Sequence, residues 1–144
     1  MLCRVRNLLC ALPLEHVVET MRALPVEPMA GLPAFVRGLA VVRGTPTPVL
    51  DASALLCGER APPVRFVTIR TGQRHVVLAV DAVIGVVELP PETARTLPPL
   101  FQHAGPDALS AVGALDGALL LVLESARLVP DDVWAAIDRG GAPA

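Results

Sequence analysis

The chain repeats part of itself, and this repeat limits its possible folds more than any other feature. Residues 41–56, VVRGTPTPVLDASALL, align without gaps with residues 114–129, ALDGALLLVLESARLV, at an offset of 73. Residues 11–19, ALPLEHVVE, parallel residues 77–85, VLAVDAVIG, at an offset of 66. The repeat predicts two copies of one small unit. Because each copy alone would bury too little surface to be stable, we expect the two copies to share a core.

Short apolar runs rich in Val and Leu, separated by Gly, Pro, Asn or Asp, fill both copies. Runs of roughly four to eight such residues are typical of β-strands. The Asp116-Gly117 pair lies between two runs and indicates a hairpin, because both positions tolerate positive φ. Further turn signals occur at Arg6-Asn7 and at residues 71–73. The spacing of the strands predicts a small barrel or sandwich.

Two short helices are predicted among these strands. Asp51 can cap a helix over residues 52–57, with Gly58 as its stop. A C-terminal helix is predicted at about residues 130–139, with apolar side chains on one side and a glycine pair after it.

Pro46 and Pro48 are two residues apart in one predicted strand, so they remove two backbone donors from the same edge. We expect this strand to be an edge or to carry a local break. The second copy has Leu119 and Leu121 at the matching positions, and its strand is free to pair on both sides.

Composition excludes several classes of protein. The 144 residues are 53% apolar and 18% charged, which is ample for one domain with a core and argues against disorder. The net charge is −2, with one Trp and no Tyr, so no basic aromatic surface for nucleic acid is expected. No apolar stretch approaches the ~20 residues of a membrane helix, and no signal-peptide pattern opens the chain. We expect a cytoplasmic protein without direct membrane insertion.

The chain shows no constellation for catalysis, and we expect neither enzyme activity nor a cofactor or metal site. The three cysteines form no CxxC, and the three histidines have no partner at ligand spacing. Ser53 and Ser125 follow capping acids and are expected at surface helical positions. His103 is expected in a loop. Such a chain is better suited to binding a partner than to transforming a substrate.

Four stretches carry a resemblance to a known family. They are CALPLEHVVETMR (10–22), LPAFVRGLAVVRGTPTPVLD (32–51), TGQRHVVLAVDAVIGVVEL (71–89) and VGALDGALLLVLESARLVP (112–130). In these stretches, which occur in the family's order, the chain resembles the CheW-like coupling domains of bacterial chemosensory systems.

The resemblance implies an all-β fold with a few short helices. The expected architecture is two SH3-like five-stranded β-barrels packed around a shared hydrophobic core, plus a short C-terminal helix. One domain would span residues 1–144. Its two intertwined units would lie mainly at residues 8–58 and 64–130.

The resemblance also implies a non-catalytic adaptor that couples methyl-accepting chemoreceptors to a CheA-type histidine kinase. Its partners would be the hairpin tip of the receptor and the regulatory domain of the kinase, and it would be recruited to membrane-associated receptor arrays. A divergent small β-barrel for protein interaction or ligand binding, outside motility signalling, stays open as the alternative.

Carried over position by position, the resemblance assigns receptor binding to Val17, Glu19, Arg43 and Val86. It assigns kinase binding to a segment from Arg70 to Glu88, without individual residues. We expect Glu19 and Arg43 to form an ion pair at an apolar groove between the two barrels, where charges at the rim would fix the register of the partner.

Overall fold

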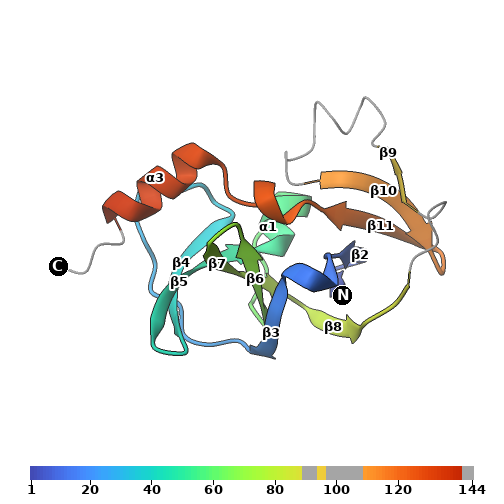
Figure 1. Cartoon of the computed structure of the whole chain (residues 1–144), viewed down its shortest axis with the longest axis horizontal. Helices are drawn as coiled ribbons and strands as arrows, with labels where there is room; N and C mark the ends of the chain where they lie inside the picture. The colour runs from blue at the N-terminus through green and yellow to red at the C-terminus, as the bar shows by residue number, and fades with distance from the viewer. Residues whose placement is uncertain (89–93, 97–108, 141–144) are drawn as a thin grey trace.

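Two β-sheets lie side by side in the computed structural model, which describes residues 1–88, 94–96 and 109–140 (Figure 1). The first sheet has the order β3 (Val17–Arg22), β6 (Arg65–Thr71), β7 (Arg74–Val80), β5 (Thr45–Asp51), β4 (Val36–Val42). The second has the order β8 (Ala82–Gly85), β1 (Leu2–Val5), β2 (Leu8–Ala11), β11 (Ala118–Leu123), β10 (Leu109–Leu115), β9 (Ala94–Thr96). The predicted all-β fold is confirmed, and the second sheet gains a sixth strand from the three residues of β9.

Both predicted helices are present. The side chain of Asp51 accepts a hydrogen bond from the Ala54 N–H at the start of α1 (Ala52–Cys57), and Gly58 ends this helix at φ 79°. The C-terminal helix, α3 (Asp131–Gly140), packs against the first sheet, far from the N-terminus (Figure 1). Two 3-10 turns complete the fold, η1 (Leu14–His16) and η2 (Ser125–Arg127). Among the described residues, no helix is long and apolar enough to cross a membrane.

Strand register reproduces the sequence repeat. In the β4–β5 hairpin Val36 pairs with Leu50, and a bulge follows before Gly38. In β10–β11, 73 residues later, Leu109 pairs with Leu123, and a bulge follows at the same position. The hairpins β1–β2 and β6–β7 correspond in the same way at the offset of 66, so that the Cys3–Cys10 pair matches Ile69–Val76. The two copies therefore share pairing, bulges and turns.

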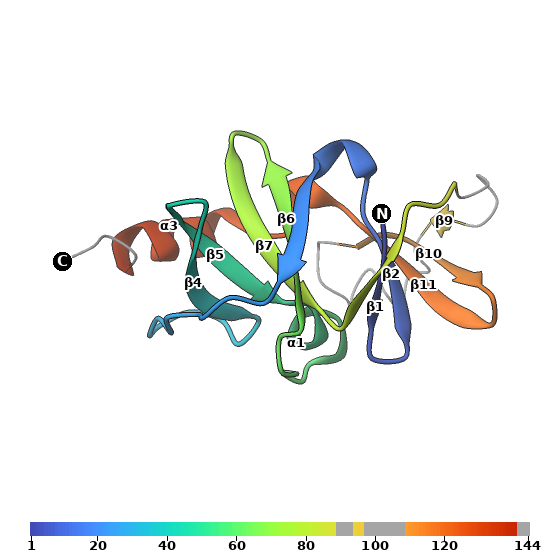
Figure 2. The same cartoon turned by 90° about the horizontal axis from the view of Figure 1, so that it is seen from below.

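The two sheets divide the chain differently from the predicted units at residues 8–58 and 64–130. Strand β5 pairs in parallel with β7, with Val49 opposite Val77. Strand β11 pairs in parallel with β2, with Val122 opposite Ala11. This is the equivalent pair in the repeat, because Val122 corresponds to Val49 and Ala11 to Val77. Each copy thus gives its first hairpin to the sheet of the other copy, and the two units interlock (Figure 2).

One buried cluster joins both sheets to the C-terminal helix, which confirms the shared core. It includes Cys3 and Leu123 from the second sheet, Ile69 and Leu78 from the first, and Ile137 from α3. Two smaller clusters lie outside it. One surrounds Phe66, and the other contains Leu9 and Leu120.

The strand with the two prolines is continuous and is not an edge strand, but its pairing on one side is cut short, as a local break predicts. Strand β5 pairs with β4 along its whole length, but its ladder with β7 covers only Val49, Leu50 and Asp51. In the second copy the ladder between β11 and β2 already begins at Leu120, the equivalent of Thr47. The two copies therefore differ at this place, although Leu119 also lies outside the parallel ladder.

Candidate partner-binding site

The side chains of Glu19 and Arg43 form the predicted ion pair, and both come from elements of the first sheet. The groove expected between the two barrels stays a prediction. Arg43 donates from Nη2 to Glu19 Oε1 at 2.9 Å and from Nε to Oε2 at 3.2 Å. Glu19 lies in β3, and Arg43 occupies the tip of the β4–β5 hairpin at φ 52°, followed by Gly44 at φ 80°. Two consecutive residues with positive φ form a tight two-residue turn, which projects the Arg43 side chain from the end of the hairpin.

This geometry keeps both groups charged. Hydrogen bonds from Arg43 lower the pKa of Glu19 below its ordinary value, and the same bonds raise the pKa of Arg43. The Arg43 side chain is 80% exposed, so the pair contributes little to the stability of the fold. Its main effect is to hold a guanidinium in a fixed orientation at the surface.

The other two predicted receptor positions differ in their surroundings. Val17 precedes Glu19 by two residues on β3, is partly buried and packs against the main core. Val86 follows β8 in the other sheet and is 60% exposed. The structure thus brings together Glu19 and Arg43, with Val17 on the same strand as Glu19, while Val86 directly follows an edge strand of the second sheet.

Two exposed apolar residues were missed by the sequence interpretation. Val18 is the extra residue of a β-bulge in β3, and Ile84 is the extra residue of the equivalent bulge in β8. They are 46% and 47% exposed. A bulge in an edge strand re-aims a side chain, and both of these side chains are left exposed at the surface. The offset of 66, which pairs residue 18 with residue 84, was the available signal.

The segment predicted to bind the kinase, from Arg70 to Glu88, spans the end of β6, all of β7 and β8. Its centre, residues 76–80, is buried. Its exposed residues are Arg70 and residues 72–75, around the β6–β7 turn, and Ile84 and residues 86–88, in and after β8. Any partner of this segment would have to contact those two ends.

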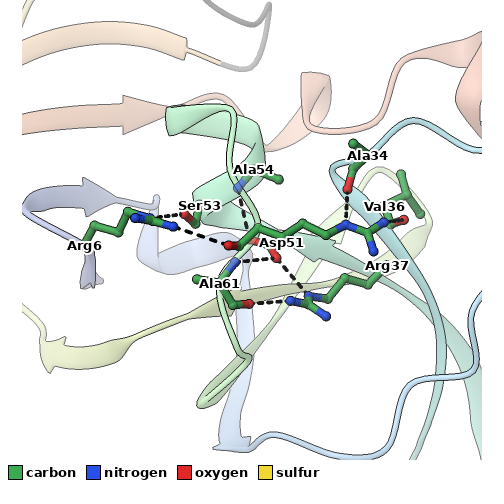
Figure 3. Close-up of polar contacts among 9 residues, drawn as sticks. Arg6, Ala34, Val36, Arg37, Asp51, Ser53, Ala54 and Ala61 are labelled. Carbon is green, nitrogen blue, oxygen red and sulfur yellow. Dashed lines mark hydrogen bonds and ion pairs between the residues drawn. The ribbon is translucent and has the colours of Figure 1, made fainter.

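The buried carboxylate of Asp51, at the end of β5, connects β4, α1 and the segment that precedes β6 (Figure 3). The Asp51 side chain accepts hydrogen bonds from Arg37 Nε at 2.9 Å, from Ala54 N–H at 3.0 Å and from Ala61 N–H at 3.3 Å. Its side chain is 3% exposed. Three donors of this kind offset the cost of burying a charge, so the network is structural.

The prediction of surface positions for Ser53 and Ser125 was wrong. Their exposed fractions are 2% and 1%, because the turns that they begin pack inward. Arg6 donates from Nε to Ser53 Oγ at 2.6 Å (Figure 3). Its backbone N–H donates to Asp81 Oδ2 at 2.6 Å. The Arg6 side chain therefore ties the β1–β2 turn to α1.

The described residues form no group of three or more His, Cys, Asp and Glu side chains that could hold a metal ion. Cys3 and Cys10 are buried free thiols, and Cys57 is exposed. Burial raises the pKa of Cys3 to about 11, which disfavours the thiolate that a nucleophile requires. His103 lies outside the described residues.

Comparisons with known proteins agree with this architecture. A family model described as the CheW-like domain matches residues 1–133. The chain is 25% identical over 114 residues to the chemotaxis protein CheW of Klebsiella aerogenes, a match that covers 77% of this chain and 69% of that protein. It is 30% identical over 111 residues to the chemotaxis protein CheW of Rhizobium meliloti, covering 75% and 72%.

Two further proteins are similar. Protein FrzA of Myxococcus xanthus is 33% identical over 99 residues, which cover 67% of this chain and 61% of FrzA. The crystal structure of the scaffolding protein TtCheW from Thermoanaerobacter tengcongensis matches with a TM-score of 0.72 at 18% identity, covering 85% of this chain and 86% of that one. At this identity the structural match shows a shared fold.

Proposed function

Because the chain belongs to the CheW-like domain family, an adaptor and scaffold family of chemotaxis, we propose that it couples chemoreceptors to a CheA-type histidine kinase. It would do so by binding both proteins, with no chemical step of its own. The observation that carries this proposal is the Glu19–Arg43 pair, which fixes a guanidinium on a strand edge that also exposes Val18.

The receptor partner in this proposal is the cytoplasmic hairpin tip, an antiparallel pair of helices. Val17, Glu19 and Arg43 would contact it from the first sheet and Val86 from the second. Apolar side chains supply contact area in such an interface, and a charge held in place at its rim selects one register of the partner. The pairing of Arg43 with Glu19 reduces the entropy lost when Arg43 meets a partner.

The kinase partner would be the regulatory domain of a CheA-type kinase. It would contact the exposed ends of the segment from Arg70 to Glu88. An adaptor of this kind acts on the cytoplasmic side of receptor arrays, so we place the protein there, held by its partners.

Pull-down with receptor hairpin fragments tests the receptor part. Arg43→Ala should reduce capture about tenfold or more, as expected when one oriented charged contact is lost. Arg22→Ala is the matched control, because Arg22 is an exposed arginine on β3, the strand of Glu19, and has no ion-pair partner among the described residues. Normal capture by a well-folded Arg43→Ala protein would contradict the role.

A charge swap separates recognition from structure. The double variant Glu19→Arg with Arg43→Glu keeps an ion pair but reverses its polarity. If the pair only supports the fold, the swapped protein should bind the receptor fragment normally. If Arg43 contacts the receptor directly, as we propose, the swapped protein should bind the receptor fragment as weakly as Arg43→Ala does. Its thermal unfolding midpoint should change little. A protein that captures neither the receptor nor the kinase domain would favour an interaction module outside motility signalling.

A further inference from the structure

A cavity of about 300 Å³ opens where β5 and β7 separate. Residues 45–48 of β5, residues 73–75 at the start of β7, and Trp134 of α3 line it. If the parallel ladder continued from the Val49–Val77 pair, Thr47 would lie opposite His75. The ladder instead ends at Val49, and the two strands diverge.

The second copy shows how this place looks when it is closed. The equivalents of Thr47 and His75 are Leu120 and Leu9, which are paired in the parallel ladder. They are 0% and 4% exposed and belong to one apolar cluster. The same arrangement of two parallel strands can therefore be fully paired, with apolar side chains filling the space between them. The first copy is open because it carries prolines and polar side chains at these positions.

The β5 wall of the cavity presents a backbone acceptor that the ladders of the sheet leave unpaired. Pro46 and Pro48 lie opposite Val41 and Leu39 in the ladder with β4. Because proline has no N–H, these are the pairs without mutual hydrogen bonds, and their carbonyl groups point away from β4, toward the side of β7. The parallel ladder engages the Pro48 carbonyl at the Val49–Val77 pair, so the Pro46 carbonyl is the one that faces the cavity. A ligand with N–H donors suits such an edge.

The opposite wall already holds a guanidinium. Arg74 lies with its Cζ 3.8 Å from the centroid of the Trp134 ring and donates to both carboxylate oxygens of Asp138, at 3.0 Å and 2.6 Å. Asp131, Trp134 and Asp138 follow the spacing i, i+3, i+7 and therefore share one face of α3. Asp131 is exposed and has no hydrogen-bond or ion-pair partner among the described residues.

We propose that this cavity binds the side chain of an arginine from a partner protein. The planar guanidinium would donate to the carbonyl group of Pro46 and to the carboxylate of Asp131, beside the indole of Trp134. Arg74 is paired with Asp138, which leaves Asp131 as the uncompensated carboxylate on the face of α3 that carries Trp134. The inference does not depend on the proposed receptor contacts, although residues 73–75 fall within the segment proposed for the kinase.

Trp134 provides the readout, because it is the single Trp and the chain has no Tyr. The probe is the peptide N-acetyl-Gly-Arg-Gly-amide, titrated into the full chain while indole fluorescence is recorded. The matched probe carries citrulline, which has nearly the same shape without the charge. Arginine should give a saturable change, and citrulline should bind about tenfold more weakly or worse.

Three variants complete the test. Asp131→Asn should weaken binding of the arginine peptide about fivefold to tenfold, whereas Asp132→Asn, one residue away and off the Trp134 face, should not change it. Thr47→Leu with His75→Leu copies the closed second copy and should abolish binding in a folded protein. Equal binding of the two peptides, or unchanged binding by this double variant, would overturn the inference. Receptor and kinase pull-downs are scored separately, so the two proposals can fail independently.

Discussion

Arg43 and Glu19 join the two edges of the first sheet. Strand β3 carries Glu19 and is one edge, and β4 leads into the turn that carries Arg43 at the other edge. The two residues are 24 positions apart in sequence and 2.9 Å apart between Nη2 and Oε1. Paired backbone hydrogen bonds between Glu27 and Leu39 bring a second segment to the same edge. The pair therefore spans the seam at which this sheet curls into a barrel, which is where a partner would meet both edges at once.

The titration of Glu19 should report on this pair. Its pKa in the folded chain is lowered from the ordinary value of 4.5 by hydrogen bonds from Arg43. The interaction is thus fully present above pH 4.5 and is lost as pH falls through the lowered pKa. Carboxyl carbon shifts in NMR should give a midpoint below 4.5 for Glu19. Arg43→Ala should return that midpoint toward 4.5, and a midpoint unchanged by Arg43→Ala would show that the pair is not populated in solution.

Much of the fold could be predicted from the sequence, because turn chemistry and apolar runs are local signals. Asp116-Gly117 and Arg43-Gly44 adopt nearly the same turn, at φ 50° and 79° and at φ 52° and 80°. The exchange of hairpins between copies could not be predicted. It depends on which strand pairs in parallel with β5 and which pairs with β11. The apolar sequences of β2 and β7 are compatible with either pairing. The burial of Ser125 could not be predicted either. It results from tertiary packing, and the sequence around Ser125 contains no signal for it.

The candidate site was predictable only in part. The resemblance indicated Glu19 and Arg43, and the structure pairs them. The bulges that expose Val18 and Ile84 arise from strand register. No residue type within β3 or β8 predicts where that register shifts. The cavity beside Trp134 needs three separate segments to come together. Its one visible sign in the sequence was the Pro46-Pro48 pair.

Asp51 should be the most sensitive polar residue of the first sheet. Asp51→Ala removes a helix cap and leaves the Arg37 guanidinium without its buried partner, so we expect a loss of about 3 kcal/mol in the free energy of unfolding. Urea denaturation monitored by circular dichroism would measure it. Glu124 is the matched control, because it stands at the equivalent position before η2 and makes no side-chain cap hydrogen bond. Glu124→Ala should cost about 0.5 kcal/mol or less. Equal losses would mean that the Asp51 contacts add nothing.

The two copies should differ in their tolerance of proline. Leu121 matches Pro48, but it lies in the ladder between β11 and β2, opposite Cys10. Leu121→Pro removes a donor toward β2 and a buried side chain, at a cost of about 3 kcal/mol or more. Leu121→Ala isolates the side-chain part and should cost at least about 1 kcal/mol less than the proline variant. If both variants lose the same stability in urea, the parallel ladder does not depend on this donor.

The three cysteines should react in two classes. Cys57 is exposed at the end of α1, whereas Cys3 and Cys10 face each other in β1 and β2 at 0% exposure. Burial raises the pKa of Cys3 to about 11 and raises that of Cys10 as well, so neither forms much thiolate at pH 8. A thiol reagent such as dithionitrobenzoate should therefore modify one group per folded chain quickly and the remaining two only after unfolding in urea. Cys57→Ser should abolish the fast reaction and leave the slow one. Fast modification of a second thiol in the folded Cys57→Ser protein would show that the β1–β2 hairpin opens readily, contrary to its place in the shared core.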